Sequence, residues 1–597
     1  MRRLQYILGV TYILLISNPC ATFAQDSVFN QVVTVERDYQ PEIEEANIIH
    51  IKPSILQVQV DPNPVVYSTY STPLSVGMNL HPLQAAELQF TAPSQLNGII
   101  DAAVGHRNTH LNFAYQLREK KNWSIDLFAK HDAYWGTDSQ SKSAVGIDVC
   151  RKFSNLDFFA NASGNVMHWD YYKTMMDEDY GLVHIDLGNS ILWDANANVG
   201  IKSTGNNAFQ YRIQTGYSAV GQMSLAEHMV NTHIDAAWTN NTHTVGVKAY
   251  VKNNFFIETS GDLTVDDEYY SPSSKHSRHA IRVEPFYAYS HKNFHLHAGV
   301  NIDMNIDSFM DGENWLSKTD NLGFAPSPNV QVSWHSTNNL LHVYANATGR
   351  YGTATMDEKH MYNPYTYSIY ETNYIAPYTP IDATVGIKLR PIKTMLLDIY
   401  GGYALRLSDY ATYVDVYKHL DATNTAFNFI STTYSIGKQS YEQCKIGANL
   451  HYHYRDILEI NVGGNYYFYH QRPISSVESN NELYNQIANS NKYSGWITTA
   501  FDRPNWDAYA RIEAHIDSKW SIYSDNYFAG SRQAIILPYT SATIRPTISL
   551  NIGGQYAINR WLSVYAEVND YLNRKDEIFY GFKSQGIHFL VGAKYKF

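Results

Sequence analysis

The sequence predicts an all-β protein, a transmembrane antiparallel β-barrel of about 22 strands, within a range of roughly 20 to 24. Three observations predict this fold: an export signal at the N-terminus, an apolar–polar alternation of period two from about residue 96 onward, and a final apolar stripe that ends at Phe597. Together they divide the chain into residues 1–24, 25–95 and 96–597.

The N-terminus has the composition of a cleavable signal peptide. Arg2 and Arg3 supply positive charge, residues 6–16 (YILGVTYILLI) form an apolar core, and residues 22–24 (TFA) precede Gln25 as a small-residue cleavage site. The apolar core is too short to cross a bilayer of about 30 Å. Cys20 follows a proline, which argues against a lipoprotein signal. We therefore predict an exported chain that begins at Gln25.

The composition is aromatic without being strongly apolar. There are 48 Tyr, 24 Phe and 11 Trp, only 17% charged residues, and a mean hydropathy of -0.35. After the signal we find no apolar run of about 18 residues, so only β-strands could carry the chain through a membrane. The net charge of -11 argues against nucleic acid as a partner. Cys150 and Cys444 are too few for a disulfide framework.

The alternation predicts the strands and their connections. In residues 562–569 (LSVYAEVN), Leu562, Val564, Ala566 and Val568 share one face and polar or mixed residues share the other. One face suits lipid and the other suits the lumen. At about 23 residues per strand with its half-loops, the barrel segment accommodates about 22 strands. Short periplasmic turns are expected at residues 118–122, 153–155, 238–243, 290–293, 336–339, 454–456 and 559–560, and long extracellular loops at 253–277, 303–325, 351–378, 406–435 and 471–491.

The C-terminal residues carry a family resemblance. Residues 569–574 (NDYLNR) and the final segment 586–597 resemble the end of a TonB-dependent receptor barrel, and the loops and the Ala24–Gln25 junction resemble Bacteroidetes outer-membrane proteins. The resemblance implies a Gram-negative outer-membrane location. It also implies insertion by the barrel-assembly machinery, which would recognise the strand ending at Phe597, and uptake of a ligand.

The chain departs from that family at its N-terminal side. Receptors of this type carry a globular plug, whereas only residues 25–95 lie between the signal and the barrel, which is too short for a full plug. We expect an extended segment there, in the periplasm or in the lumen. Residues 32–35 (VVTV) resemble a TonB box that could pair with TonB by β-augmentation. The alternative is an ordinary linker.

Two pairs of histidines are weak candidates for metal ligands. His295 with His297, and His451 with His453, are each two positions apart on a strand and therefore share a face. Each pair could offer two imidazoles, but a third ligand must come from elsewhere. The simpler explanation, which we prefer, is that they are ordinary polar side chains of the lumen, and no cofactor is expected. Carboxylates and lysines are also predicted to point inward: Asp126, Asp398, Glu459, Glu567, Lys130, Lys594 and Lys596.

Tyrosines gather in one predicted extracellular loop. Tyr362, Tyr365, Tyr367 and Tyr370 could contact a ligand, because aromatic rings stack on sugars and supply contact area in interfaces. They could also pack only on the barrel rim. We find no catalytic motif in a credible context and predict that the chain is not an enzyme.

Two functions stay open at this point. The first is transport or uptake of a ligand across the outer membrane. The second is a structural barrel whose loops scaffold a surface lipoprotein or an outer-membrane complex.

Overall fold

The computed structural model describes most of the chain from residue 98 to the C-terminus. The described residues are 98–119, 122–136, 139–177, 181–204, 208–222, 225–258, 264–265, 268–269, 276–309, 323–353, 355–364, 377–420, 427–455, 457–471, 500–537 and 540–597. The predicted signal peptide and the predicted segment 25–95 lie outside these residues.

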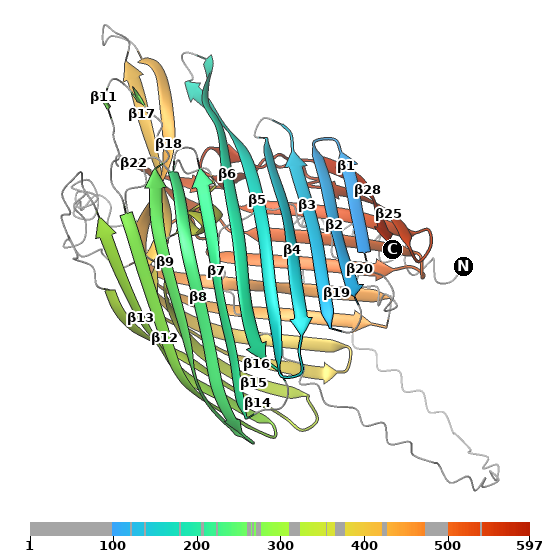
Figure 1. Cartoon of the computed structure of the whole chain (residues 1–597). Coiled ribbons are helices and arrows are strands. Elements are labelled where there is room, and N and C mark those ends of the chain that lie inside the picture. Colours follow the sequence, from blue (N-terminus) through green and yellow to red (C-terminus); the bar gives the residue numbers. More distant parts are fainter. Residues whose placement is uncertain are drawn as a thin grey trace, which may run out of the picture. The chain divides into compact units, whose positions relative to one another are not determined.

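The described residues form a closed antiparallel barrel with 22 strands in its wall (Figure 1). This confirms the predicted fold class and strand number. The wall strands are β1 (Gly98–Gly105), β2 (Asn108–Glu119), β3 (Trp123–Tyr134), β4 (Gln140–Lys152), β5 (Leu156–Asp177), β6 (Gly181–Ser203), β7 (Phe209–Gln222), β8 (Leu225–Asn240), β9 (His243–Glu258), β12 (His276–His291), β13 (Phe294–Phe309), β14 (Gly323–His335), β15 (Leu341–Tyr351), β16 (Tyr378–Ile392), β17 (Met395–Leu420), β18 (Phe427–Tyr454), β19 (Leu458–Gln471), β20 (Trp506–His515), β21 (Trp520–Ala529), β24 (Thr547–Ala557), β25 (Leu562–Asn569) and β28 (His588–Lys596).

The first and last strands close the ring. β28 pairs antiparallel with both β1 and β25, so the sheet has no open edge at the seam. At the end of the seam, the Gly98 amide donates to the Phe597 carbonyl at 2.8 Å and the Phe597 amide donates to the Gly98 carbonyl at 3.0 Å. The Phe597 ring lies over Gly98, where a Cβ would come within 2.4 Å of it. The C-terminal stripe read from the sequence is therefore the closing strand.

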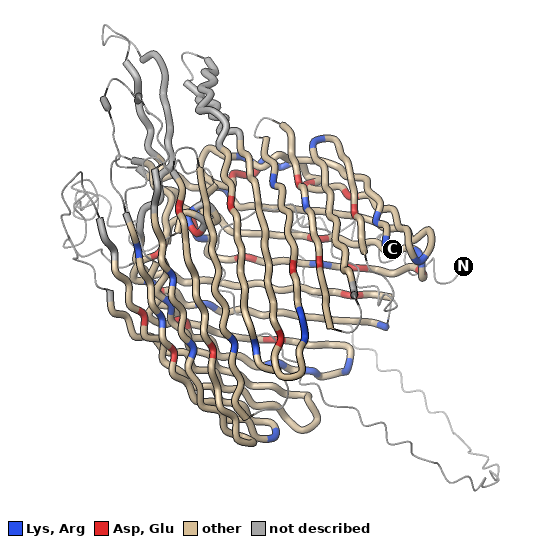
Figure 2. Tube along the Cα trace, in the orientation of Figure 1, with Lys and Arg blue, Asp and Glu red and all other residues tan. Residues whose placement is uncertain are grey.

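The two faces of the wall differ as the alternation predicts. Outward positions expose large apolar side chains, with Val104, Val145, Val385, Ile446 and Val591 between 55% and 62% exposed. Charged groups, by contrast, are buried on inward positions, and Figure 2 shows acidic and basic residues spread along the wall strands. This pattern suits lipid outside and a polar lumen inside. No helix among the described residues is long and apolar enough to span a bilayer.

All connections at the periplasmic end are short, whereas those at the other end range from short turns, as between β1 and β2 or β7 and β8, to long loops. The predicted short turns all fall between consecutive wall strands, and Asn241 and Lys292 have φ of 52° and 50° in two of them. The prediction of a loop over residues 406–435 is wrong, because β17 continues to Leu420 and β18 starts at Phe427, and the two strands stay paired. A strand crosses a membrane in about 9–11 residues, so these two strands extend beyond it. Beyond the membrane the outward side chains no longer need to be apolar, so the alternation that predicts strands is lost there.

Smaller elements lie in the extracellular connections. They are β10 (Thr264–Val265), β11 (Glu268–Tyr269), helix α2 (Met356–Tyr362), β22 (Arg532–Leu537), β23 (Thr540–Ile544), β26 (Glu577–Phe579) and β27 (Phe582–Lys583). β22 pairs in parallel with the upper part of β17, over Tyr413 to Asp415. The loop between β21 and β24 is therefore joined to the wall by backbone hydrogen bonds.

Candidate functional site

The connection between β15 and β16 turns inward and rests on the inner wall. We call residues 352–364 of this connection the strap; all but residue 354 are described. Helix α2 forms its centre, and Thr355 caps the helix by accepting a hydrogen bond from the Glu358 amide at 3.2 Å. Thr355 and Glu358 form the T-x-x-E pattern that is typical of a helix start. The predicted all-β fold did not include this helix.

Charged side chains of β8, β9 and β12 hold the start of the strap. Glu227 of β8 accepts a hydrogen bond from the Met356 amide at 2.7 Å. Lys252 of β9 donates to the Thr353 hydroxyl at 3.0 Å, and Arg278 of β12 donates to the Thr353 carbonyl. Glu227 is fully buried and Arg278 is 1% exposed. We call this group, Glu227, Lys252, Arg278, Thr353 and Met356, the first anchor.

An apolar contact completes the first anchor. The Met356 side chain packs in a buried cluster with Leu192 of β6, Val220 of β7 and Met229 of β8. Met361, on the same short helix, is 54% exposed. One side of α2 therefore lies against the wall while another side is open.

The end of the strap is held by a different part of the barrel. The Tyr362 hydroxyl donates to Asp502 Oδ2 at 2.9 Å, and the Asn363 amide nitrogen donates to the Thr412 hydroxyl of β17 at 3.2 Å. Asp502 also accepts from the Thr412 backbone amide at 2.7 Å. We call this group, Tyr362, Asn363, Thr412 and Asp502, the second anchor. It joins the strap, β17 and the segment before β20 in one hydrogen-bonded unit.

A buried ion pair lies beside the second anchor. Arg503 donates to Asp409 Oδ2 of β17 at 2.9 Å, and Tyr441 donates to the same carboxylate. Asp409 lies beyond the part of β17 that a membrane needs. Burial alone would raise its pKa, but Arg503, Arg406 and the hydrogen bonds from Tyr441 and the Tyr410 amide together outweigh that effect and lower the pKa of Asp409 below its ordinary value. Asp409 and Arg503 are therefore both charged at any physiological pH.

The second anchor extends to loops from the far side of the mouth. The ring centroids of Tyr362 and Phe579 are 6.5 Å apart, and Phe579 packs with Phe582 and with Val414 of β17. Phe579 and Phe582 lie in the connection between β25 and β28. On the ring of strands, β8 and β25 are far apart, with β28 and β1 to β7 between them on one side. Contacts through the strap thus link nearly opposite sides of the extracellular mouth.

Of the four predicted ligand-binding tyrosines, the structure describes one. Tyr362 is 5% exposed, and burial raises its pKa well above the ordinary value, so its hydroxyl stays a neutral donor. Its ring packs on Tyr410 with centroids 5.5 Å apart, and Arg503 lies over it at 5.5 Å. Tyr365, Tyr367 and Tyr370 lie outside the described residues.

The histidine pairs have partners on the inner wall. His297 Nε2 is 3.1 Å from Glu284 Oε1, and His295 Nδ1 is 3.2 Å from the Ser290 hydroxyl. His451 contacts Asn461. Nowhere in the described part of the chain do three or more His, Cys, Asp or Glu side chains gather as a metal site.

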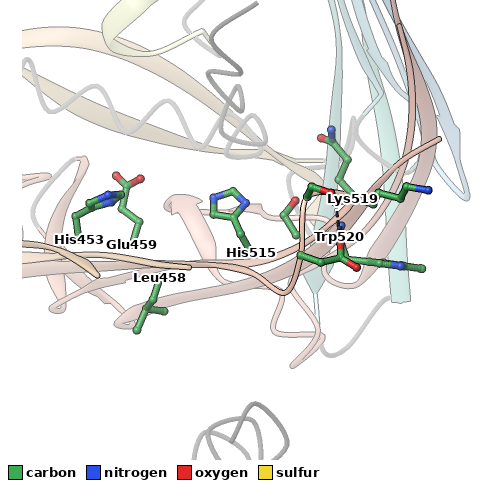
Figure 3. A pocket seen from close by; sticks show the side chains of 10 residues that line it. His453, Leu458, Glu459, His515, Lys519 and Trp520 are labelled. Atoms are coloured by element: carbon green, nitrogen blue, oxygen red, sulfur yellow. Dashed lines mark hydrogen bonds between the residues drawn. The ribbon is translucent and has the colours of Figure 1, made fainter. Parts of the chain in front are cut away.

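His453 lines a cavity near the turn between β20 and β21. The cavity has a volume of about 350 Å³, and Figure 3 shows His453, Glu459 and His515 along it, with Lys519 and Trp520 at the turn. Acidic, basic and aromatic side chains all contribute to this lining. The cavity lies at the end of the barrel opposite the strap, because this short turn is periplasmic.

Carboxylates of the inner wall are bonded across strands. Asp398 accepts from the Tyr344 hydroxyl at 3.0 Å, and Glu567 accepts from Tyr523. Lys594 lies 3.2 Å from Asp101. These groups form a hydrogen-bonded polar lining on the lumen side of the wall.

Comparisons with known proteins identify the fold. No family model matches the chain, and no curated protein matches its sequence. Among solved structures, the siderophore receptor PiuA of Acinetobacter baumannii superposes with a TM-score of 0.60 at 7% identity, covering 85% of this chain and 82% of the receptor. The ferric-catecholate import receptor Fiu of E. coli gives 0.57 at 11% identity, with coverage of 85% and 82%. The copper transporter OprC gives 0.58 at 10% identity, with coverage of 84% and 80%.

The likeness to these structures is one of fold. The chain is a 22-stranded β-barrel of the kind found in outer-membrane receptors, and the apolar outer belt fits an outer-membrane location. At identities of 7% to 11%, ligands are not carried over from these proteins to this chain.

Proposed function

We propose that this chain transports a ligand across the outer membrane, and that the ligand enters through the extracellular mouth beside the strap. One observation carries the proposal: a wall of 22 strands has a polar lining, and a folded connection lies across its extracellular end. A barrel of this size encloses a lumen wider than side chains alone would fill. A polar lumen with an obstructed mouth suits regulated passage.

Two further parts of the proposal come from the likeness to receptors. We propose that TonB, or a protein like it, supplies energy by pairing with residues 32–35. We also propose that Tyr365, Tyr367 and Tyr370 contact the ligand, since the same loop forms the strap. Binding of a TonB periplasmic domain to the full mature chain, compared with a variant in which residues 32–35 are replaced by Gly and Ser, tests the first part. Equal binding by both chains contradicts it.

Conductance in planar bilayers tests the transport function. We expect the full mature chain to give little current, and a variant lacking residues 25–95 and carrying Glu227→Ala and Tyr362→Phe to give stepwise conductance. If this variant gives no conductance although its gel shift when unheated shows that it is folded, the result contradicts a pore.

A second function is favoured by the long strands. β5 and β6 have 22 and 23 residues, and β17 and β18 have 26 and 28, well above the about 9–11 residues that a membrane needs. Extended strand pairs outside the membrane offer a platform for a surface lipoprotein or another outer-membrane protein. Mild detergent extraction followed by mass spectrometry tests this, because a scaffold should bring a partner along in constant ratio. A chain that always elutes alone argues against it.

A further inference from the structure

The strap has two faces with different surroundings, which makes it a candidate for a moving part. Met356 is 7% exposed and lies in the apolar cluster of the first anchor, whereas Met361 is 54% exposed. Both belong to α2, which has seven residues. An isolated helix of this length is unstable in water, so α2 exists because of its contacts with the wall.

The first anchor is made of groups that water can also satisfy. Glu227 and Arg278 reach from wall strands to main-chain atoms of the strap, and both are buried. Burying charged groups is costly, and a charged group regains hydration when it is uncovered. Release of the strap therefore loses hydrogen bonds but returns Glu227, Lys252 and Arg278 to water.

The second anchor differs in kind. Tyr362 packs between aromatic rings, and its hydroxyl bonds to Asp502, which is held at the same time by the backbone of β17. Release there would expose Tyr362 and Phe579, which water does not compensate. Release of the first anchor also exposes Met356 and its apolar neighbours, but there the charged groups regain water, whereas the second anchor loses the packing of two aromatic rings, Tyr362 and Phe579. On this balance the first anchor is the weaker of the two attachments.

From this contrast we infer that the strap is a gate of the extracellular mouth, and that it opens by release of the first anchor while the second anchor holds. Its role in passage rests on the proposed transport function. Its movement does not, since a barrel of any function could carry a strap that opens.

Cysteine labelling on intact cells measures the movement. In a background with Cys150→Ser and Cys444→Ser, Met356→Cys reports release and Met361→Cys serves as the matched control on the same helix. With a membrane-impermeant maleimide, we expect Met356→Cys to react at least about tenfold more slowly than Met361→Cys. Adding Glu227→Ala should speed labelling of Met356→Cys by about tenfold or more, because the Met356 amide then loses its acceptor and an unsatisfied buried donor costs about 1–3 kcal/mol. Labelling of Met361→Cys should not change.

Two results overturn the inference. If both cysteines react equally in the otherwise unchanged chain, the strap is not seated. If Met356→Cys stays slow with Glu227→Ala and also with Arg278→Ala, the strap is a fixed part of the wall. Glu227→Gln is the matched control, because it keeps an acceptor oxygen for the Met356 amide and should therefore leave labelling of Met356→Cys slow. The gel shift of the unheated barrel shows that each variant is folded. Faster labelling without any gain in conductance would leave the gate intact and contradict the proposed transport function instead.

Discussion

Replacing Arg503 with alanine removes the cation that is bonded to Asp409 at the mouth of the barrel. The side chain of Arg503 is 6% exposed and that of Asp409 is 14% exposed. Removing one partner of a buried ion pair costs about 3–5 kcal/mol, because the other charge is left buried. Arg406 stays close to Asp409, and Tyr441 still donates to it, so we expect the lower end, about 3 kcal/mol.

That free energy applies to local opening of the segment that carries Arg503. Since 1.36 kcal/mol corresponds to a factor of ten, about 3 kcal/mol raises the open population by about 100-fold. Ala500, only 1% exposed, is a suitable reporter when replaced by cysteine in the Cys150→Ser, Cys444→Ser background. Its rate of reaction with a maleimide should rise by about 100-fold in Arg503→Ala.

Arg350→Ala is the matched control. Arg350 lies 3.3 Å from Glu358, but its side chain is 56% exposed, and exposed pairs contribute about 0–1 kcal/mol. We expect less than about a fivefold change in that variant. If Arg503→Ala and Arg350→Ala change the labelling rate equally, the buried pair does not hold this segment. The double variant Arg503→Ala, Asp409→Asn should recover part of the loss, because no charge is then left unpaired.

Three further predictions concern the seam and the last loop. Deleting Phe597 removes both terminal backbone hydrogen bonds to Gly98, so we expect a lower yield of folded barrel on unheated gels. An unchanged yield would contradict a role of these bonds in closing the barrel. In Gly105→Ala, a Cβ would lie 1.9 Å from the Phe589 carbonyl, so we expect a lower unfolding temperature by gel shift, which an unchanged temperature would contradict. Burial raises the pKa of Asp570 to about 6, so its loop should resist protease best in acid and lose that resistance as pH rises through about 6. In Asp570→Asn, the loop should resist protease at pH 7.5 as well as the unchanged chain does in acid. If its resistance still varies with pH in this variant, ionisation of Asp570 is not the cause.

The fold could be read from the sequence because lipid imposes a simple rule. Every second outward side chain must be apolar, and residues such as Val564 and Val568 follow that rule regardless of which strands are neighbours. The closing strand carried the same stripe up to Phe597. Where strands leave the membrane, as in the upper parts of β17 and β18, the rule no longer acts. The sequence therefore predicts a loop where the structure has two paired strands.

The strap could not be found in the same way. Its two anchors join residues that are 129 and 140 positions apart, in the bonds of Glu227 to Met356 and of Tyr362 to Asp502. No local period connects such residues. The pattern from Thr355 to Glu358 indicates only that a helix starts there. Likewise, the tyrosine-rich composition of this loop pointed to contacts, but it could not show that Tyr362 faces Asp502.

The polar groups of the mouth divide into those that hold the wall together and those that hold the strap. Arg503, Asp409 and Tyr441 bond the connection before β20 to β17 and β18. Glu227 and Arg278 bond the wall to a connection that starts several strands away, and in the seated state they are buried. In the inferred opening, the second set is exposed to water together with Met356 and its apolar neighbours. The polar part of this contact lies in a few side chains of β8, β9 and β12, so the inferred gate predicts that a ligand competing for those side chains favours the released strap.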